Sequence, residues 1–413
     1  MANSARPKRA MSTGMDQSEL AVLRRLLQSA AELGSATRAD LARSTGLARS
    51  TVSQYVDQLQ QRRLLVEDPG TQPTGGRPAH RLRVNPRAGV ILAADLGATT
   101  ATLAATDLGG QILGEPQTTT HFDIAGGPQR VLEWVDEGFA ALLGEANLHP
   151  RDVRSVSIGV PGPVAHTTGT VIRPPIMPGW DGYQIPGFFA DRYAAPTLVD
   201  NDVNLMAVGE YHFRRATGDF LFVKVGTGVG CGIINNGRLH RGAEGAAGDI
   251  GHIRVPDANA LCRCGNTGCL EAVASGGALA RDLAKLGKLV RTSTDVARIA
   301  QDGDTEARRA IRAASDHLGE VLATLVSFHN PALIVIGGSL AKLDEALLTG
   351  IRSRIYQRAL PLATRELRIE TSKLGDRAGV TGASSLARDH LLSVGLASLL
   401  TSPPPTPRPS TSR

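Results

Sequence analysis

The chain has 413 residues, of which 42% are hydrophobic, 20% are charged and only 4% are aromatic. This length predicts two or three domains, with cores built from Leu, Val, Ile and Ala. The sequence has no apolar run of about 18 residues and no signal-peptide pattern, so we expect a cytoplasmic protein without a transmembrane helix.

The positive charge is concentrated at one end of the chain. The formal net charge is +6, yet residues 1–90 contain 14 Lys and Arg against 7 Asp and Glu, a net of +7. About −1 is left for the remainder. A basic N-terminal module on a near-neutral body favours a protein that binds nucleic acid through one domain and is associated with the nucleoid. A solvated basic face without a partner is the alternative.

Residues 1–17 are expected to form a disordered basic tail, and residues 18–85 a winged helix-turn-helix domain. An apolar helical face begins at Ser18 and ends at Gly34. Thr37 can cap a short helix to Ser44, Gly46 supplies a turn, and a second helix follows over 48–62. The groups expected to reach DNA from these helices are Arg38, Arg49, Ser50, Thr51, Ser53, Gln54 and Tyr55. An ordinary helical hairpin is the alternative for this pair of helices.

Two strands are predicted around residues 62–70 and 80–85, with the Gly- and Pro-rich sequence TQPTGGRPA between them. They form the wing. Its segment Gly75-Gly76-Arg77-Pro78 is similar to flexible segments that place an arginine in an A·T-rich minor groove. The negative potential of that narrow groove attracts the guanidinium of Arg77.

The body is predicted to be an α/β structure with lobes at 90–200 and 201–392, whose C-terminal helix can return to the first lobe. Short strands are each followed by a glycine-rich turn. Helices are expected at 129–145, 278–286, 293–299, 305–328 and 340–356, and residues 400–413 form a disordered tail. Such turns can bind phosphate through backbone amides, here through Asp95, Gly97, Thr99, Gly226, Thr227, Gly228, Gly337 and Gly338. Together they indicate a two-lobed, actin-like ATPase fold (ribonuclease H-like) with a cleft between the lobes.

Three of the four cysteines lie within eight residues in the sequence GHIRVPDANALCRCGNTGCLE, over 251–271. Three thiolates and one imidazole are the usual ligands of a structural zinc ion, here His252, Cys262, Cys264 and Cys269. A surface loop with unused thiols is the alternative. The fourth cysteine, Cys231, lies in an apolar strand pattern and is expected to be a small buried hydrophobic residue.

The motif GH-x9-C-x-C-G-x2-G-C-x-E at 251–271 resembles the ROK family of repressors and sugar kinases, and the resemblance covers about 18–392. Its winged-helix members are regulators of the xylose-repressor and N-acetylglucosamine-repressor type. The resemblance implies zinc on the Cys and His residues. It also implies that Asp202 is the base that deprotonates a sugar hydroxyl if kinase activity is retained, and that the sugar ligands are Asn201, Asp202, Asp249, His252 and Glu271. A cap or turn role for Asp202 is compatible with this.

Three positions depart from the family pattern. Ala98 replaces the second glycine of the phosphate turn, Asp249 replaces a glutamate, and Ile176 stands where a sugar-binding asparagine is expected. A methyl group at Ala98 obstructs close approach of phosphate to the backbone. We therefore expect a ligand site without efficient kinase activity, and a doubtful role for ATP and Mg²⁺.

The sequence thus predicts a sugar-responsive transcriptional regulator, a repressor of carbohydrate genes. It would bind a palindromic operator as a homodimer or homotetramer, with a sugar or sugar phosphate as effector and without contacting a membrane. Two alternatives are an ATP-dependent sugar kinase with a DNA-binding head, and a regulator controlled by a protein partner.

Overall fold

The computed structural model describes residues 16–68, 80–120 and 122–401. The predicted tails, 1–17 and 400–413, lie largely outside these ranges. The segment between the two wing strands, with Arg77, lies wholly outside them. The chain divides into two compact units, and each is described by itself. Unit 1 comprises residues 1–90, 107–111 and 388–413, and unit 2 comprises residues 91–106 and 112–387. No helix in the described ranges is long and apolar enough to cross a membrane.

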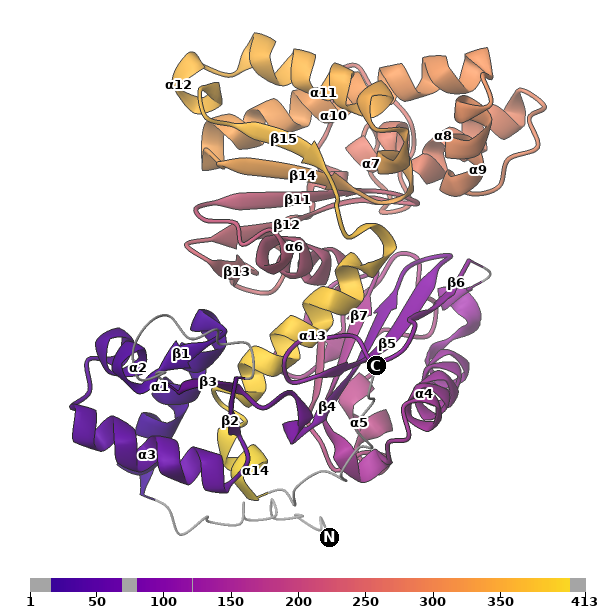
Figure 1. The fold of residues 1–413 in the computed structure, drawn as a ribbon. Helices are drawn as coiled ribbons and strands as arrows, with labels where there is room; N and C mark the ends of the chain where they lie inside the picture. Colours follow the sequence, from indigo (N-terminus) through magenta and orange to yellow (C-terminus); the bar gives the residue numbers. More distant parts are fainter. Residues whose placement is uncertain (1–15, 69–79, 121, 402–413) are drawn as a thin grey trace, which may run out of the picture. The chain divides into compact units, whose positions relative to one another are not determined.

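Unit 1 contains the predicted helix-turn-helix (Figure 1). Thr37 caps the second helix, because its side chain accepts a hydrogen bond from the Asp40 amide while the Asp40 carboxylate accepts one from the Thr37 amide. Gly46 ends that helix in the left-handed conformation. The order of strands in the small sheet is β1-β3-β2. The elements are α1 (Gln17–Leu33), β1 (Ala36–Thr37), α2 (Arg38–Thr45), α3 (Arg49–Gln61), β2 (Leu65–Glu67) and β3 (Arg81–Val84).

The core of unit 1 is aliphatic, as the composition predicts. The 3.6-residue spacing of apolar side chains places one face of each helix inside. A short C-terminal helix, α14 (Leu396–Thr401), contacts α1, and the sequence analysis did not predict this helix. The fully buried side chains of the three N-terminal helices include Leu23, Leu26, Leu27, Leu41, Val52, Val56 and Leu59.

Unit 2 contains two five-stranded sheets. The first has the order β10-β7-β4-β5-β6, with β10 and β7 parallel and β5 and β6 antiparallel. Its central strands β4 and β7 are buried on both faces. β4 is apolar except for Asp95, as expected for such a strand, whereas β7 also carries the buried Arg154, Ser155 and Ser157. The strands are β4 (Val90–Leu96), β5 (Ala101–Asp107), β6 (Gln117–Thr119), β7 (Val153–Val160) and β10 (Thr197–Asn201), and the helices near them are α4 (Pro128–Glu145), α5 (Ile185–Phe189), α6 (Asp202–Phe213) and α13 (Ala378–Leu391).

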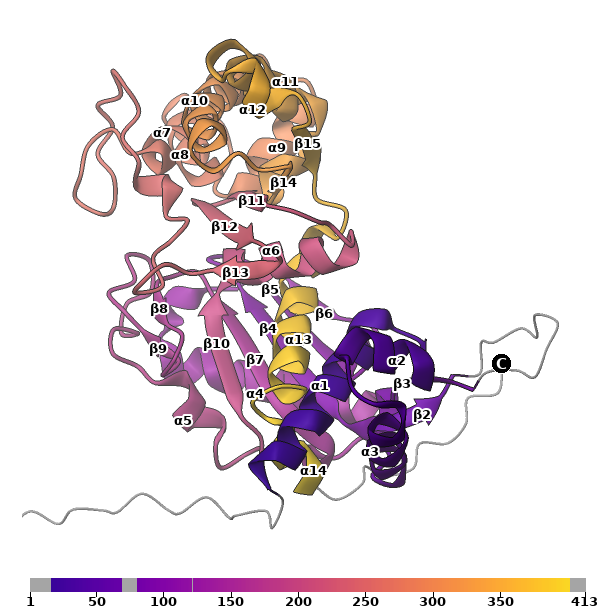
Figure 2. The ribbon, with the colours of Figure 1, turned by 90° about the vertical axis from the view of Figure 1, so that its left-hand side faces the viewer.

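The second sheet has the order β13-β12-β11-β14-β15. β11 pairs with β12 in the antiparallel sense and with β14 in the parallel sense. α10 and α11 lie side by side over this sheet (Figure 2). The elements are β11 (Phe220–Val225), β12 (Val229–Asn235), β13 (Arg238–His240), β14 (Leu333–Gly337), β15 (Arg368–Thr371), α7 (Leu270–Ala274), α8 (Gly276–Lys285), α9 (Ser293–Gln301), α10 (Thr305–His329), α11 (Glu345–Arg358) and α12 (Pro361–Thr364), while the two-stranded pair β8 (Val164–Ala165) and β9 (Thr170–Val171) stands apart.

The last long helix packs on the first sheet. Val380 and Ala383 of α13 share a buried cluster with Ala93 of β4 and Leu205 of α6. α6 and α13 cross closely, because a Cβ at Gly382 would lie 1.7 Å from the Leu205 carbonyl oxygen. A glycine at this crossing is therefore a packing requirement.

One predicted helix is wrong as a single element. The segment 340–356 is a 3₁₀ turn over Ser339–Leu343 followed by α11, and Asp344 between them has a φ of +46°. Asp is among the few residues that tolerate the left-handed region, so the chain changes direction there. Apolar periodicity alone does not reveal this break.

Candidate functional site

The cysteine and histidine residues of the 251–271 motif converge on one point. The Nδ1 or Nε2 atom of His252 and the Sγ atoms of Cys262, Cys264 and Cys269 all lie within 4.8 Å of one another. The Cys262 Sγ is 3.6 Å from the His252 Nδ1, and the Cys264 Sγ is 3.7 Å from the Cys269 Sγ. The loop folds back through Gly265 and Gly268, both at positive φ.

This donor set fits a tetrahedral zinc ion. Zn–S bonds of about 2.3 Å imply sulfur–sulfur edges of about 3.8 Å in a tetrahedron, close to the 3.7 Å between the Cys264 and Cys269 sulfurs. Three thiolates and an imidazole also suit zinc chemically. Four protein ligands leave no coordination position for water, so the ion would hold the loop together. Cys231 is buried elsewhere, in β12, as predicted.

His252 connects the cluster to a carboxylate. Its Nδ1 faces Cys262, whereas its Nε2 lies 3.8 Å from a carboxylate oxygen of Asp249. Glu271 lies in the first turn of α7 and accepts a hydrogen bond from the Val229 amide at 3.2 Å. A Cβ at Gly228 would lie 2.4 Å from the Glu271 carboxylate. The metal motif is thus held against the glycine turn before β12.

The start of α6 packs on the same strand. A Cβ at Gly230 would lie 3.0 Å from a methyl group of Val203. Asn201 is the N-cap of α6 and accepts hydrogen bonds from the Val203 and Asn204 amides. The start of α6 and the metal motif therefore both pack against residues at the start of β12.

Both carboxylate oxygens of Asp202 already have partners within the protein. The Val203 amide donates to Oδ1 at 2.9 Å, and the ammonium of Lys224 donates to Oδ2. The Asp202 side chain is only 3% exposed. The sequence analysis did not single out Lys224, although a lysine within the apolar strand FLFVKV was an available signal.

Asp95 completes this group of charges at the end of β4. Its Oδ1 is buried without a hydrogen-bond partner among the described residues. Burial, reinforced by the charge of Asp202 and opposed by that of Lys224, raises the pKa of Asp95 to about 7. The carboxyl group is therefore partly protonated near neutral pH.

The raised pKa of Asp95 predicts a pH-dependent stability. A carboxyl whose pKa is higher in the folded state stabilises the fold below its unfolded pKa, near 3.8, and this contribution is lost as the pH rises through about 7. The melting temperature of Asp95→Asn minus that of the wild type should therefore be larger at pH 8 than at pH 5. Thermal unfolding at both pH values measures this. Asp316→Asn, on an exposed ion pair of α10, is the control. A pH-independent difference for Asp95→Asn would contradict the assignment.

The glycine turns that were predicted to bind phosphate follow the ends of interior strands of the two sheets, β4, β11 and β14. The turn at Gly226–Gly228 is held by the start of α8, since the Gly276 amide donates to the Gly226 carbonyl at 2.7 Å. Gly338 has a φ of +87°, and a Cβ there would lie 2.6 Å from the Val225 carbonyl oxygen. Asp95, Gly97 and Thr99 lie on β4 and the turn after it. Phosphate binding at these turns stays a prediction.

In unit 1, the start of α3 presents polar side chains. Arg49, Ser50 and Gln54 are exposed, while Thr51, Ser53 and Tyr55 are half-buried. Arg38 of α2 binds the Ser53 side chain and carbonyl and also the Asp57 carboxylate. Arg38 and Ser53 therefore hold α2 and α3 together. The other predicted positions are more available to contact DNA.

Comparison with known proteins agrees with this arrangement. A model of the ROK family matches residues 91–390, and a model of the IclR helix-turn-helix domain matches residues 20–69. The chain belongs to the ROK family.

Two relatives match most of the chain. The xylose repressor of Caldicellulosiruptor bescii is 29% identical over 375 residues, covering 86% of this chain and 92% of that protein. The DNA-binding transcriptional dual regulator NagC of Escherichia coli is 29% identical over 373 residues, covering 87% and 90%.

Solved ROK structures show the same fold. A ROK family transcriptional regulator, described as a homologue of the E. coli MLC protein, has a TM-score of 0.76 and 25% identity, covering 93% of this chain and 100% of that chain. A ROK glucokinase from Streptomyces griseus, in complex with glucose and AMPPNP, has a TM-score of 0.64 and 28% identity, covering 73% and 99%.

Proposed function

We propose that this ROK protein is a sugar-responsive DNA-binding regulator, a repressor of genes for carbohydrate uptake or catabolism. The proposal rests on the presence of two different parts in one chain. Unit 1 is a helix-turn-helix with exposed polar groups at the start of α3, and unit 2 brings the metal motif next to the expected sugar residues. A relative named as a xylose repressor and one named as a DNA-binding transcriptional dual regulator, matched over 86% and 87% of this chain, support it.

A palindromic operator and a dimer or tetramer are part of the proposal. Helix-turn-helix dimers bind half-sites about one helical turn apart, so a small change in the separation of two recognition helices weakens simultaneous contact. The sugar must bind one conformation more tightly than the other, since a ligand shifts an equilibrium only by its differential affinity. The proposal also includes a zinc ion on the cluster that His252 shares with three cysteines.

A sugar kinase with a DNA-binding head is the less favoured function. Ala98 adds a methyl group in the phosphate turn, and the two oxygens of Asp202 are bonded to Val203 and Lys224. A general base needs a free oxygen within reach of the sugar hydroxyl. A coupled assay of ATP-dependent phosphorylation across hexoses, pentoses and N-acetyl sugars decides between the two functions. ATP-dependent turnover that Asp202→Ala abolishes would establish the kinase instead.

Removal of one recognition-helix arginine tests the DNA-binding part. Arg49→Ala should weaken operator binding about tenfold or more, because a good arginine contact to a base edge contributes about 1–3 kcal/mol. Fluorescence anisotropy with DNA from the region upstream of the gene measures the affinity. Arg298→Ala, at an exposed position of α9, is the matched control and should bind as the wild type does. Equal affinity of Arg49→Ala and wild type would count against α3 as the recognition helix.

A further inference from the structure

A polar cavity lies at the carboxyl end of α6, beside the first residues of β14 and β15. Its volume is about 330 Å³, which is enough to hold a small molecule. Asp202, one of the expected sugar residues, is at the opposite end of α6, about 16 Å away along the helix axis. The cavity is therefore separate from the site described above.

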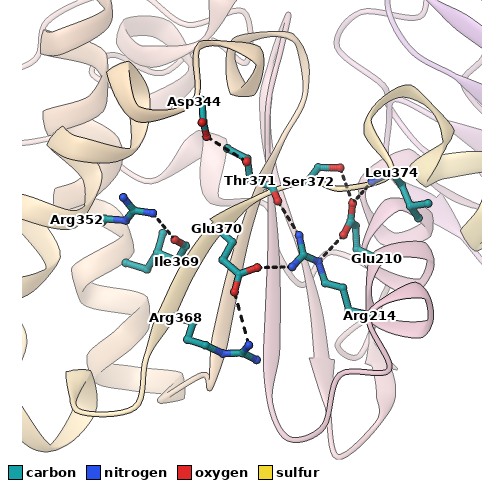
Figure 3. A network of polar contacts seen from close by, with 10 residues as sticks. All are labelled: Glu210, Arg214, Asp344, Arg352, Arg368, Ile369, Glu370, Thr371, Ser372 and Leu374. Carbon is teal, nitrogen blue, oxygen red and sulfur yellow. Dashed lines mark hydrogen bonds and ion pairs between the residues drawn. The ribbon is translucent and has the colours of Figure 1, made fainter.

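Positive charge dominates the lining of this cavity. Four of the lining side chains are cationic and one is acidic: Arg214, Arg215, Arg368 and Lys373 against Glu370. Glu370 is bonded to Arg214 and lies 3.6 Å from Arg368 (Figure 3). Arg214 also binds Glu210, which is 0% exposed. Four cations against these two carboxylates leave a net charge of +2.

Two of the four cations have no partner of their own. Among the described residues, the side chains of Arg215 and Lys373 take part in no hydrogen bond or ion pair, and both are exposed. Asp219 and Asp376, the acids that follow them in the chain, do not line the cavity and are each bonded elsewhere. Two positive charges are thus left uncompensated at the cavity.

Arg215 occupies a backbone position that usually selects glycine. Its φ is +48°, in the left-handed region. The Arg215 amide donates to the His212 carbonyl oxygen at 3.1 Å, and the Ala216 amide donates to that of Tyr211 at 3.0 Å. These bonds end a helix at a left-handed residue, most often glycine. A glycine at this position therefore removes the charge of Arg215 and eases the backbone turn.

The end of α6 also sets the sign of the electrostatic balance. The carboxyl end of a helix carries about half a negative charge, which opposes an anion. Two carbonyl groups of this end are already bonded within the turn, and the uncompensated charges of Arg215 and Lys373 are larger than the helix dipole. A phosphate group carries a charge of about −1.5 to −2 near neutral pH, so it matches the excess charge of the lining.

We propose that this cavity binds a phosphate group, with Arg215 and Lys373 as its main contacts. The volume of about 330 Å³ leaves room for an organic group beside the phosphate. The Phe213 ring, 56% exposed, lines the cavity and can pack on such a group. These features favour a small phosphorylated metabolite over the free ion. The site does not depend on what the metal motif binds.

Protection of Lys373 from acetylation tests the proposal locally. The full-length protein is treated briefly with an acetylating reagent, and each lysine is followed by peptide mass spectrometry. Inorganic phosphate, glucose 6-phosphate and adenosine monophosphate are added separately, with glucose and adenosine as uncharged controls. At ten times its dissociation constant, a phosphate compound should slow acetylation of Lys373 about tenfold by mass action. Lys285, which is 69% exposed on α8, should react as before.

The pattern of protection decides between the possible outcomes. Stronger protection by an ester than by inorganic phosphate identifies a phosphorylated metabolite, and equal protection identifies the free ion as the source. Failure of all three phosphate compounds to protect Lys373 would overturn the proposal. Protection of Lys342, which follows the Gly337–Gly338 turn, without protection of Lys373 would place the phosphate at the glycine turn and would also overturn it.

Arg215→Gly tests the stated cause. It should keep the melting temperature of the wild type or raise it, and should weaken the protecting compound by about tenfold or more, as for the loss of one charged hydrogen bond. The matched control, Arg312→Ala, removes an exposed arginine of α10 whose side chain also lacks a partner among the described residues. It should leave the protection unchanged. Unchanged affinity in Arg215→Gly, or an equal loss in Arg312→Ala, would refute a specific site.

Discussion

Arg214→Leu is expected to lower the free energy of unfolding of the body by about 3–5 kcal/mol, the cost of leaving a buried charge without its partner. Glu210 of α6 is 0% exposed, and Arg214, one turn later, is 6% exposed. The guanidinium binds Glu210, Glu370 and the Thr371 carbonyl oxygen (Figure 3). Its loss leaves the Glu210 carboxylate with the Ser372 hydroxyl and the Leu374 amide as its remaining donors.

This network fastens α6 to the connection between β15 and α13. Ser372 and Leu374 lie on that connection, and both donate to the same oxygen of Glu210. α6 begins at the expected sugar residues and α13 packs against α6, so both ends of this link matter for the site. Loss of Arg214 should therefore loosen the site as well as the fold.

Urea unfolding followed by tryptophan fluorescence measures the effect, because both tryptophans, Trp134 and Trp180, lie in unit 2. The control is Arg298→Leu, which removes an exposed arginine from its pairs with Asp295 and Asp302. It should cost less than about 1 kcal/mol. A loss of that small size for Arg214→Leu would show that the buried network does not stabilise the body.

Cys264→Ser is expected to abolish stable zinc binding. It removes one of four converging ligands. The loop that carries the other cysteines is otherwise held by backbone hydrogen bonds within itself, such as those from Val255 to Gly268 and from Cys262 to Asn266. Metal affinity and local folding are coupled in such sites. Elemental analysis after dialysis should give about one zinc per chain for the wild type and roughly none for the variant. The hydrogen bond between Glu271 and the Val229 amide then loses its support.

Cys231→Ala is the matched control for this loss. Cys231 is a cysteine of unit 2 outside the cluster; unlike the exposed Cys264 it is buried, and burial raises the pKa of its thiol to about 12. It should retain one zinc per chain. A Cys264→Ser protein that still carries a full equivalent of zinc would contradict the proposed ligand set.

Local patterns were sufficient for much of the fold. The cap at Thr37, the turn at Gly46 and the apolar face of α3 depend on residues a few positions apart, and the structure places them as predicted. The Cys and His residues are likewise close in sequence, so their convergence could be anticipated from spacing. Family membership, which rests on that motif, is confirmed by the match over residues 91–390.

Contacts between distant segments could not be predicted in this way. The pairing of Lys224 with Asp202 joins β11 to α6, and the Glu210 network joins residues more than 160 positions apart. Asp344 breaks a helix that apolar periodicity favours as continuous, because its left-handed backbone leaves no apolar signal. The pairing with Lys224 is the one of these features that acts on the expected base, because it and the Val203 amide occupy both carboxylate oxygens of Asp202.

The central claim is that a sugar bound by the body changes operator binding by the helix-turn-helix. The most direct measurement is the affinity of the full-length protein for DNA from upstream of its gene, by anisotropy, with and without each neutral sugar. We predict that at least one sugar changes the affinity by about tenfold or more, within the usual range of coupling between two sites. DNA affinity that no sugar alters, while one of them demonstrably binds the body, would contradict it.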